Sequence, residues 1–228
     1  MDRVIDDIKK KQFMTFDCYG TLIDWETGIL NAIRPILNDI DDNKILELYA
    51  KFEAEAEKGN FAGYKTVLRR VMSKFYENYS TKGDEDILVE AIKNFKPFDD
   101  TVEALKRLQT NYKLGIISNV DNDLFEYTNR KLDIELSYLI TSESVGSYKP
   151  SKNNFYKALE VMNAKPEDMV HVAQSIYHDI EPASVLGFLT VKVNRSNLRR
   201  GLGATLESDS KADINVKNLN ELVSLIFG

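Results

Sequence analysis

FMTFDCYGTL, at residues 13–22, places a single acid, Asp17, directly after an apolar run and shortly before a glycine, Gly20. An apolar run without polar alternation is typical of a parallel strand that is covered on both faces. Glycine favours a turn after such a strand. Asp17 is therefore expected at the carboxyl end of a buried strand, which is where open α/β sheets bind their ligands.

Further apolar segments of the same kind follow along the chain. Together with a first strand at 12–17, they predict strands at 113–118, 138–141, 169–174 and 189–193. Amphipathic helical patterns lie between them, at 101–110 and 152–162. Strands that alternate with helices predict an α/β fold with a doubly wound, parallel (Rossmann-like) sheet.

The interval from about residue 24 to residue 96 interrupts this alternation. It contains no strand-like run, and helical patterns are found around 26–39, 44–58, 64–79 and 85–94. The chain is therefore predicted to form a core domain from residues 1–22 and 97–228. An all-helical cap domain, residues 23–96, is inserted into it.

Composition limits the classes of function. Of the 228 residues, 43% are hydrophobic and 29% are charged, which is typical of a globular protein. No apolar stretch reaches the ~18 residues of a membrane span, and the charged N-terminus lacks the apolar segment of a secretion signal. A net charge of −6 argues against a nucleic-acid partner. The single cysteine, Cys18, is expected in the core, and a cytoplasmic protein is predicted.

Polar residues recur where the predicted strands end. Asp17, Asp179, and Ser118 with its neighbour Asn119 lie at such ends, and Lys149 precedes a predicted helix. A lone aspartate at a strand end is usually a turn or cap residue. Two acids, a hydroxyl and a lysine on one edge of a sheet instead favour a catalytic site.

Four short motifs carry a family resemblance. DCYGTL at 17–22, ISN at 117–119, YKP at 148–150 and HD at 178–179 resemble, in order, the four motifs of the haloacid dehalogenase superfamily. The resemblance implies a Rossmann-like core with a helical cap. It also implies that Asp17 is a nucleophile that forms an ester with its substrate.

The residue two positions after the nucleophile distinguishes branches of this superfamily. Phosphatases carry a second aspartate there, which protonates the leaving alcohol and whose carbonyl helps to hold magnesium; this chain has Tyr19. A phenol, with an ordinary pKa of about 10, is a poor acid near neutrality. The D-x-Y-G-T form resembles the L-2-haloacid dehalogenases, which attack carbon without a metal. The resemblance therefore implies no cofactor, with magnesium needed only by a phosphatase.

The resemblance also implies roles for the other motif residues. Lys149 is expected to hold Asp17 ionised, since a nearby ammonium lowers the pKa of a carboxyl group. Asp179 either positions Lys149 or activates the water that hydrolyses the ester, and His178 is a general base, a supporting residue or a core histidine. Catalysis is thus expected from Asp17, Lys149, Asp179 and Ser118, and substrate binding from Tyr19, Thr21, Asn119, Trp25, Ser175 and His178.

The cap departs from the ordinary dehalogenase pattern. Dehalogenases of this type receive the halide with an arginine early in the second cap helix. The corresponding stretch here, LYAKFEAEAEKG at 48–59, offers Ala50 or Lys51. The arginines of the cap, Arg34, Arg69 and Arg70, do not match the expected spacing, so weak or absent dehalogenation is expected.

One subgroup of the branch matches more residues. DCYGTLIDWETG, VGSYKP and QSIYHD resemble a subgroup that includes an L-azetidine-2-carboxylate hydrolase, which opens a strained ring at carbon. Its leaving group is a ring amine that needs a proton, and Tyr19, His178 or the cap acid Glu53 are candidates to supply it. Trp25 either packs at the hinge or contacts the ligand. The run EAEAE at 53–57 is expected to form a solvated helix face.

Three functions remain open on the sequence. The first is a metal-independent hydrolase that acts on the α-carbon of a small 2-substituted carboxylic acid, of the 2-haloacid or L-azetidine-2-carboxylate type. The second is a magnesium-dependent phosphatase of a small phosphate ester, and the third is a non-catalytic binding module. The expected partner is a small carboxylate, without nucleic acid or membrane, and dimers among relatives allow a homodimer.

Overall fold

The centre of the protein is a six-stranded parallel sheet. The computed structural model describes residues 2–195, 206 and 208–228, so residues 1, 196–205 and 207 of the predicted core domain lie outside the described residues. The strand order is β5-β4-β1-β6-β7-β8, and every neighbouring pair is parallel. The strands are β1 (Phe13–Phe16), β4 (Lys113–Ser118), β5 (Tyr138–Thr141), β6 (Met169–Ala173), β7 (Leu189–Val193) and β8 (Ile214–Val216).

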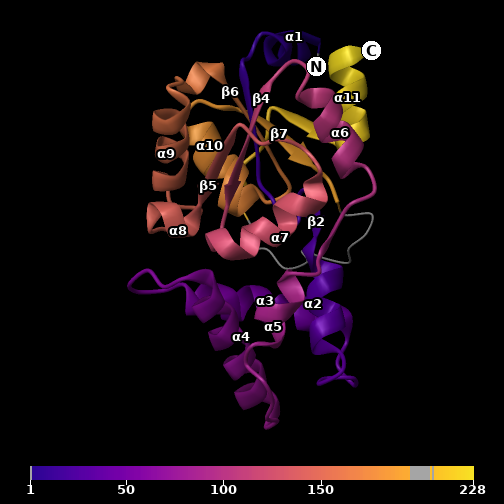
Figure 1. Ribbon diagram of the computed structural model, residues 1–228, viewed down its shortest axis with the longest axis vertical. Helices are drawn as coiled ribbons and strands as arrows, with labels where there is room; N and C mark the ends of the chain where they lie inside the picture. Colours follow the sequence, from indigo (N-terminus) through magenta and orange to yellow (C-terminus); the bar gives the residue numbers. More distant parts are fainter. Residues whose placement is uncertain (1, 196–205, 207) are drawn as a thin grey trace.

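Helices cover both faces of this sheet (Figure 1). One face carries α1 (Asp2–Lys9), α6 (Thr101–Leu108), α7 (Asn122–Leu132) and α11 (Leu219–Phe227). The other carries α9 (Asn153–Met162) and α10 (Glu181–Val185), while helix α8 (Ser142–Val145) and the 3₁₀ turn η1 (Pro166–Asp168) lie in connections. Both sides of each central strand are buried, which explains the apolar runs in the sequence. The predicted doubly wound fold is confirmed.

Strand β1 lies where the order of the strands along the sheet changes direction. It pairs with β4 on one side and with β6 on the other, and the later strands extend outward from these two. The crevice at the carboxyl end of such a strand is the usual ligand site of an open α/β sheet. Asp17, directly after β1, stands at that crevice.

The segment inserted after β1 is helical. It contains α2 (Trp25–Ile33), α3 (Asp42–Ala56), α4 (Tyr64–Tyr79) and α5 (Ile87–Ile92), which lie together beyond one end of the sheet (Figure 1). Helix α2 ends at Ile33, before the predicted residue 39, because Pro35 has no N–H with which to continue a helix. Within the described residues, no helix is long and apolar enough to cross a membrane.

The two crossings between core and cap pair with each other. β2 (Ile23–Asp24) and β3 (Lys96–Pro97) form a short antiparallel pair. Next to this pair, Phe98 N and Thr101 Oγ1 both donate to Leu22 O, at 3.0 and 2.8 Å. The predicted boundaries at 22/23 and 96/97 fall here, and the division into two domains stays a prediction.

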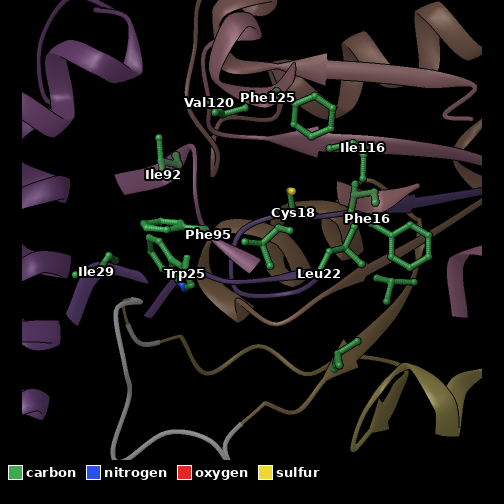
Figure 2. Packing of buried hydrophobic residues seen from close by; sticks show 14 of the residues in the cluster. Phe16, Cys18, Leu22, Trp25, Ile29, Ile92, Phe95, Ile116, Val120 and Phe125 are labelled. Atoms are coloured by element: carbon green, nitrogen blue, oxygen red, sulfur yellow. The ribbon is translucent and has the colours of Figure 1, made fainter. Parts of the chain in front are cut away.

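One hydrophobic cluster runs from the core into the cap. Phe16, Cys18 and Leu22 belong to it near the end of β1, and Trp25 and Phe95 continue it at the crossings (Figure 2). Cys18 is fully buried, as expected. Because the cluster is continuous, packing at the crossings is coupled to packing beneath the crevice.

Gly28 lies on α2 against Phe95. A Cβ atom at Gly28 would lie 2.2 Å from Cδ1 and Cε1 of Phe95, which is far inside contact distance. We expect Gly28→Ala to lower the free energy of unfolding by about 1–2 kcal/mol, since overpacking typically costs more than the helix propensity that alanine gains. Urea unfolding measures this change. In a Phe95→Leu background the cost should shrink, and an equal cost in both backgrounds would show that the ring is not the obstacle.

Candidate active site

Asp17 is held by the turn that follows β1. Gly20 has a φ of 93°, a conformation that favours glycine, and its N–H donates to Ile23 O at 2.8 Å. The reversal brings the Thr21 hydroxyl back to Asp17, where it donates to Oδ2 at 2.6 Å. Gln174 N donates to Thr21 Oγ1 at 2.9 Å and thereby orients that hydroxyl. One carboxylate oxygen of Asp17 is thus fixed by its own turn.

Lys149 bridges the two acids of the crevice. Its side chain is only 2% exposed, and its Nζ donates to Asp17 Oδ1 at 2.8 Å, to Asp179 Oδ1 at 2.6 Å and to Ile117 O at 2.8 Å. These three bonds use every hydrogen of the ammonium group. Burial disfavours the charged amine, but the two carboxylates outweigh it and raise the pKa of Lys149.

Asn119 positions the backbone of Lys149. Its Oδ1 accepts from Lys149 N at 2.8 Å, and its Nδ2 donates to Lys149 O at 3.1 Å. Asn119 lines the crevice, but both ends of its amide are engaged in this way. Asn119 therefore holds the lysine in place, and its expected contact with a substrate stays a prediction.

Asp179 lies on a single π-helical turn, η2 (Ile176–Ile180), and contacts a histidine that the motifs do not contain. Nε2 of His171 lies 3.0 Å from Asp179 Oδ1, and its Nδ1 lies 2.9 Å from Thr15 Oγ1. Burial acts to raise the pKa of Asp179, but Lys149 and His171 outweigh it, and the pKa is lowered. His171 and Thr15 face each other on β6 and β1 as polar residues inside apolar strands, a signal that sequence analysis misses.

Burial is the largest influence on the nucleophile candidate. It raises the pKa of Asp17, and the charge of Asp179 acts in the same direction. Lys149 and Thr21 act against this rise, because they hydrogen-bond to the ionised form. Lys149 lowers the pKa of Asp17 as expected, but burial outweighs it, and the pKa of Asp17 lies above its ordinary value.

A small cavity of about 50 Å³ lies over these groups, between core and cap. It is lined by Asp17, Tyr19, Trp25, Glu53, Tyr64, Ser118, Asn119, Lys149, Gln174, Ser175, His178 and Asp179. Two of its buried polar atoms, Ser118 Oγ and Trp25 Nε1, have no hydrogen-bond partner among the described residues. Buried donors are normally satisfied, so these two atoms suit a polar group of a ligand. Trp25 therefore both packs at the crossing and lines the cavity.

Tyr19, Ser175 and His178 also line this cavity. The Tyr19 hydroxyl lies 2.9 Å from Thr128 Oγ1 on α7, and burial raises its pKa well above the ordinary value. Ser175 Oγ accepts from His178 N at 3.0 Å and lies 3.2 Å from its Nδ1. Burial lowers the pKa of His178 to about 4, so its imidazole is neutral near pH 7. Neither Tyr19 nor His178 is a ready proton donor.

The cap contributes one acid to the cavity. Glu53 on α3 is 8% exposed, and its Oε1 accepts from the hydroxyls of Tyr64 at 2.6 Å and Tyr49 at 3.1 Å. The expectation that 53–57 forms a solvated face is wrong at Glu53, because this position of α3 faces the crevice. Glu55, by contrast, pairs with Lys74 at 2.7 Å nearer the surface.

The arginines of the cap lie away from this cavity. Arg34 binds Asp42, Arg69 Nε donates to Asp86 at 2.6 Å, and Arg70 Nη1 donates to Ala56 O at 3.0 Å. None of the three lines the cavity. Within the described lining, Lys149 is the only cation.

Comparison with known proteins agrees with the fold and the motifs. A family model described as haloacid dehalogenase-like hydrolase matches residues 13–187. The chain is 25% identical over 212 residues to the glyceraldehyde 3-phosphate phosphatase of Methanocaldococcus jannaschii, covering 91% of this chain and 82% of that protein. It is 23% identical over 189 residues to (S)-2-haloacid dehalogenase 4A of Burkholderia cepacia, covering 79% and 81%.

A solved relative shares the whole architecture. The structure of L-2-haloacid dehalogenase from Xanthobacter autotrophicus with chloropropionic acid covalently bound superposes with a TM-score of 0.80 at 20% identity, covering 96% of this chain and 99% of that one. At this identity the likeness shows the fold alone. These two of the sequence relatives are hydrolases that act on different bonds, so an enzyme is confirmed while its substrate stays open. Because the family model spans most of the chain, this protein belongs to the haloacid dehalogenase-like hydrolases.

Proposed function

We propose that this hydrolase attacks the α-carbon of a small 2-substituted carboxylic acid with Asp17, through an ester intermediate and without a metal. The observation that carries the proposal is the position of the Lys149 ammonium, between Asp17 Oδ1 and Asp179 Oδ1. The lysine ammonium thus occupies the space between the two carboxylates, where a divalent ion would otherwise bind them both.

The two carboxylates that the crevice could offer to magnesium, Asp17 and Asp179, both already bind the Lys149 ammonium. Mg²⁺ requires several oxygen ligands in near-octahedral geometry. Among the residues that the structure describes, no group of three or more acid, histidine or cysteine side chains is arranged to hold a metal ion. No step is therefore assigned to magnesium.

Charge also disfavours a phosphate ester. Two carboxylates and one ammonium give the crevice an excess of one negative charge. A phosphate dianion would add two more negative charges at short range, which is costly in a site of low dielectric. A substrate carboxylate adds only one negative charge, and it can accept hydrogen bonds from the unpaired donors Ser118 Oγ and Trp25 Nε1.

The reaction then takes two steps. In the first, a carboxylate oxygen of Asp17 bonds to the α-carbon while the leaving group departs with the electron pair of its bond. In the second, water attacks Cγ of the Asp17 ester, the 2-hydroxy acid leaves and the carboxylate is restored. Lys149 stabilises the carboxylate before and after reaction, and Asp179 holds Lys149 in place.

A nitrogen leaving group suits this cavity better than a halide. A departing halide gains negative charge and needs a donor or cation, and losing one such group typically costs ~3–4 kcal/mol. Lys149, the cation of the described lining, already serves two carboxylates and a carbonyl. A protonated amine gains no negative charge as it leaves. We therefore place the substrate in the L-azetidine-2-carboxylate type rather than the 2-haloacid type.

Chelation separates this function from a magnesium phosphatase. We expect turnover of L-azetidine-2-carboxylate to be the same in EDTA and in added magnesium, with little turnover of L-2-chloropropionate or of p-nitrophenyl phosphate. Product formation, measured by chromatography and by phosphate release, reports the three reactions. A magnesium-dependent phosphatase assayed in parallel verifies that EDTA acts. Phosphate release that requires magnesium would make this protein a phosphatase, like its relative from Methanocaldococcus jannaschii.

A further inference from the structure

Glu53 is the acid that the cap contributes to the cavity that Asp17 also lines, and the reaction above leaves it without a role. We propose that Glu53 is a catalytic residue that binds the leaving nitrogen of the substrate and keeps it protonated while Asp17 attacks. This inference rests on the proposed function, because it requires a nitrogen at the α-carbon.

Hydrogen bonds hold one carboxylate oxygen of Glu53, and the other oxygen can bind a ligand. Both tyrosine hydroxyls donate to Oε1, from Tyr64 at 2.6 Å and from Tyr49 at 3.1 Å, and the two hydroxyls lie 3.1 Å apart. Among the described residues, no hydrogen bond to Oε2 accompanies them. A carboxylate with one anchored oxygen is oriented in advance for a cationic partner.

The core fixes one of these tyrosines. Asp121, which follows β4, accepts from Tyr64 N at 2.6 Å and from Lys65 N at 2.9 Å, so a buried core carboxylate caps the first turn of α4. This contact suits a helix N-terminus, whose free N–H groups favour a negative charge. Tyr64 therefore connects the position of Glu53 in the cap to the core that carries Asp17.

The other candidate donors are less suited to the nitrogen. The Tyr19 hydroxyl contacts Thr128, and its pKa is raised by burial, so it holds its proton tightly. His178 has a pKa lowered to about 4 by burial and carries no spare proton near neutrality. Glu53 is buried without a basic partner, which raises its pKa to about 7 despite the two tyrosine hydrogen bonds. A group of this pKa exchanges a proton readily near neutral pH.

The charges around Glu53 favour a cation next to it. At the C-cap of its own helix, burial and the charge of Glu53 raise the pKa of Glu57 to about 9, so Glu57 is protonated near pH 7. Burial and the charge of Glu53 raise the pKa of Tyr64 on α4, and burial and the charge of Glu57 raise the pKa of Tyr148, so both phenols are uncharged near pH 7. Besides the neutral phenols of Tyr19 and Tyr64, the titratable groups that share the cavity with Glu53 are Asp17, Asp179, Lys149 and His178. With Glu53 ionised, this set has an excess of negative charge, which attracts an ammonium and repels a halide.

The proposed step balances in charge and atoms. The substrate nitrogen enters as an ammonium bound to Glu53, and the Asp17 oxygen bonds to the α-carbon. The electron pair of the broken C–N bond stays on nitrogen, which becomes a neutral amine within hydrogen-bond reach of Glu53. Hydrolysis of the ester releases one proton, and the free amine takes it up. A neutral amine leaves poorly, so the reactive class is a 2-carboxylate whose nitrogen belongs to a strained ring.

The test compares Glu53→Gln with the wild type on two probes, L-azetidine-2-carboxylate and L-2-chloropropionate. The amide is isosteric but cannot balance an ammonium, so we expect kcat/KM for the azetidine to fall by about 100-fold or more. The residual turnover of chloropropionate should stay unchanged or rise. Glu55→Gln is the matched control on the same helix, since the Glu55 carboxylate pairs with Lys74 near the surface, and it should resemble the wild type.

A pH profile gives a second readout. Binding of the ammonium requires ionised Glu53, so wild-type kcat/KM should rise with pH through about 7, the pKa of Glu53. In Glu53→Gln this limb should move to lower pH and report the Asp17 carboxyl alone. Thermal melting verifies that both variants fold.

Each adverse outcome has its own meaning. If Glu53→Gln opens the azetidine at the wild-type rate, or slows both probes equally, the role of Glu53 is overturned while the proposed function stands. If the wild type opens the azetidine and its acid limb stays in place in Glu53→Gln, Glu53 does not titrate in the reaction and the inference also falls. If the wild type acts on neither carbon substrate, the proposed function and the inference fall together.

Discussion

Asp17→Asn is expected to reduce turnover by about 10⁴–10⁶-fold while the protein keeps its fold. Removal of a nucleophile from a covalent mechanism has effects of this size. The amide has nearly the same shape as the carboxylate, and its oxygen can still accept from Lys149. Its other end faces Thr21 Oγ1, which can accept as well as donate. Steady-state kinetics measure the loss, and circular dichroism and thermal melting verify the fold.

A single turnover in water labelled with heavy oxygen tests the same residue directly. Because water attacks Cγ of the ester, the first label should enter the Asp17 carboxylate, where mass spectrometry of the peptide detects it. Asp7→Asn is the control, since Asp7 pairs with Lys10 on the exposed side of α1, and it should retain both activity and labelling. Label that appears in the product of the first turnover would show that water, rather than Asp17, attacks carbon.

Lys149→Met is expected to lower kcat/KM by about 10²–10³-fold, the usual effect of removing a charged donor from a reacting group. Lys149 opposes the rise in the pKa of Asp17 that burial causes, so its loss raises that pKa further. Activity needs ionised Asp17 and falls as the pH drops through its pKa. The acid limb of the pH–rate profile should therefore move to higher pH, and an unmoved limb would mean that Lys149 does not control Asp17.

The same variant should lose stability in a pH-dependent way. Methionine leaves Asp17 and Asp179 buried without a counter-ion, and breaking a buried pair typically costs ~3–5 kcal/mol. In the variant the folded-state pKa of Asp17, already raised by burial, rises further, and that of Asp179 rises because Lys149 no longer lowers it. The loss of stability is then full at neutral pH and shrinks as acid protonates them. Denaturant unfolding at several pH values measures this, with Lys157→Met, which removes an exposed partner of Glu160, as the control.

Much of the core is predictable because its strands are buried on both faces. Such strands give unbroken apolar runs, and the bounds of β4, β5 and β7 agree with the segments predicted at 113–118, 138–141 and 189–193. β8 lies outside every predicted strand. Only its ends, Ile214 and Val216, are buried, and a three-residue edge strand is too short for periodicity to reveal.

Some residues of the candidate site can be predicted from local sequence motifs, whereas others depend on contacts between distant parts of the chain. Asp17, Lys149 and Asp179 lie in motifs whose order along the chain places them on one edge of the sheet, and the structure brings them together. Glu53 and His171 lie in no such motif. An acid in a charged helical run is normally predicted to be exposed. Glu53 is buried instead because α3 packs over a crevice that distant segments of the chain form. The partner of His171, Asp179, lies beyond the end of the same strand, on a turn that periodicity does not describe.

The paired crossings β2 and β3 also separate the residues proposed for bond formation from the residue proposed to bind the leaving group. The groups proposed for bond formation belong to the segments before Ile23 and after Pro97, whereas Glu53 belongs to the stretch between them. Substitutions on α3 can therefore change which leaving group is accepted while Asp17, Lys149 and Asp179 keep their contacts. One nucleophile can in this way be retained through evolution while a single inserted helix is altered to suit new substrates.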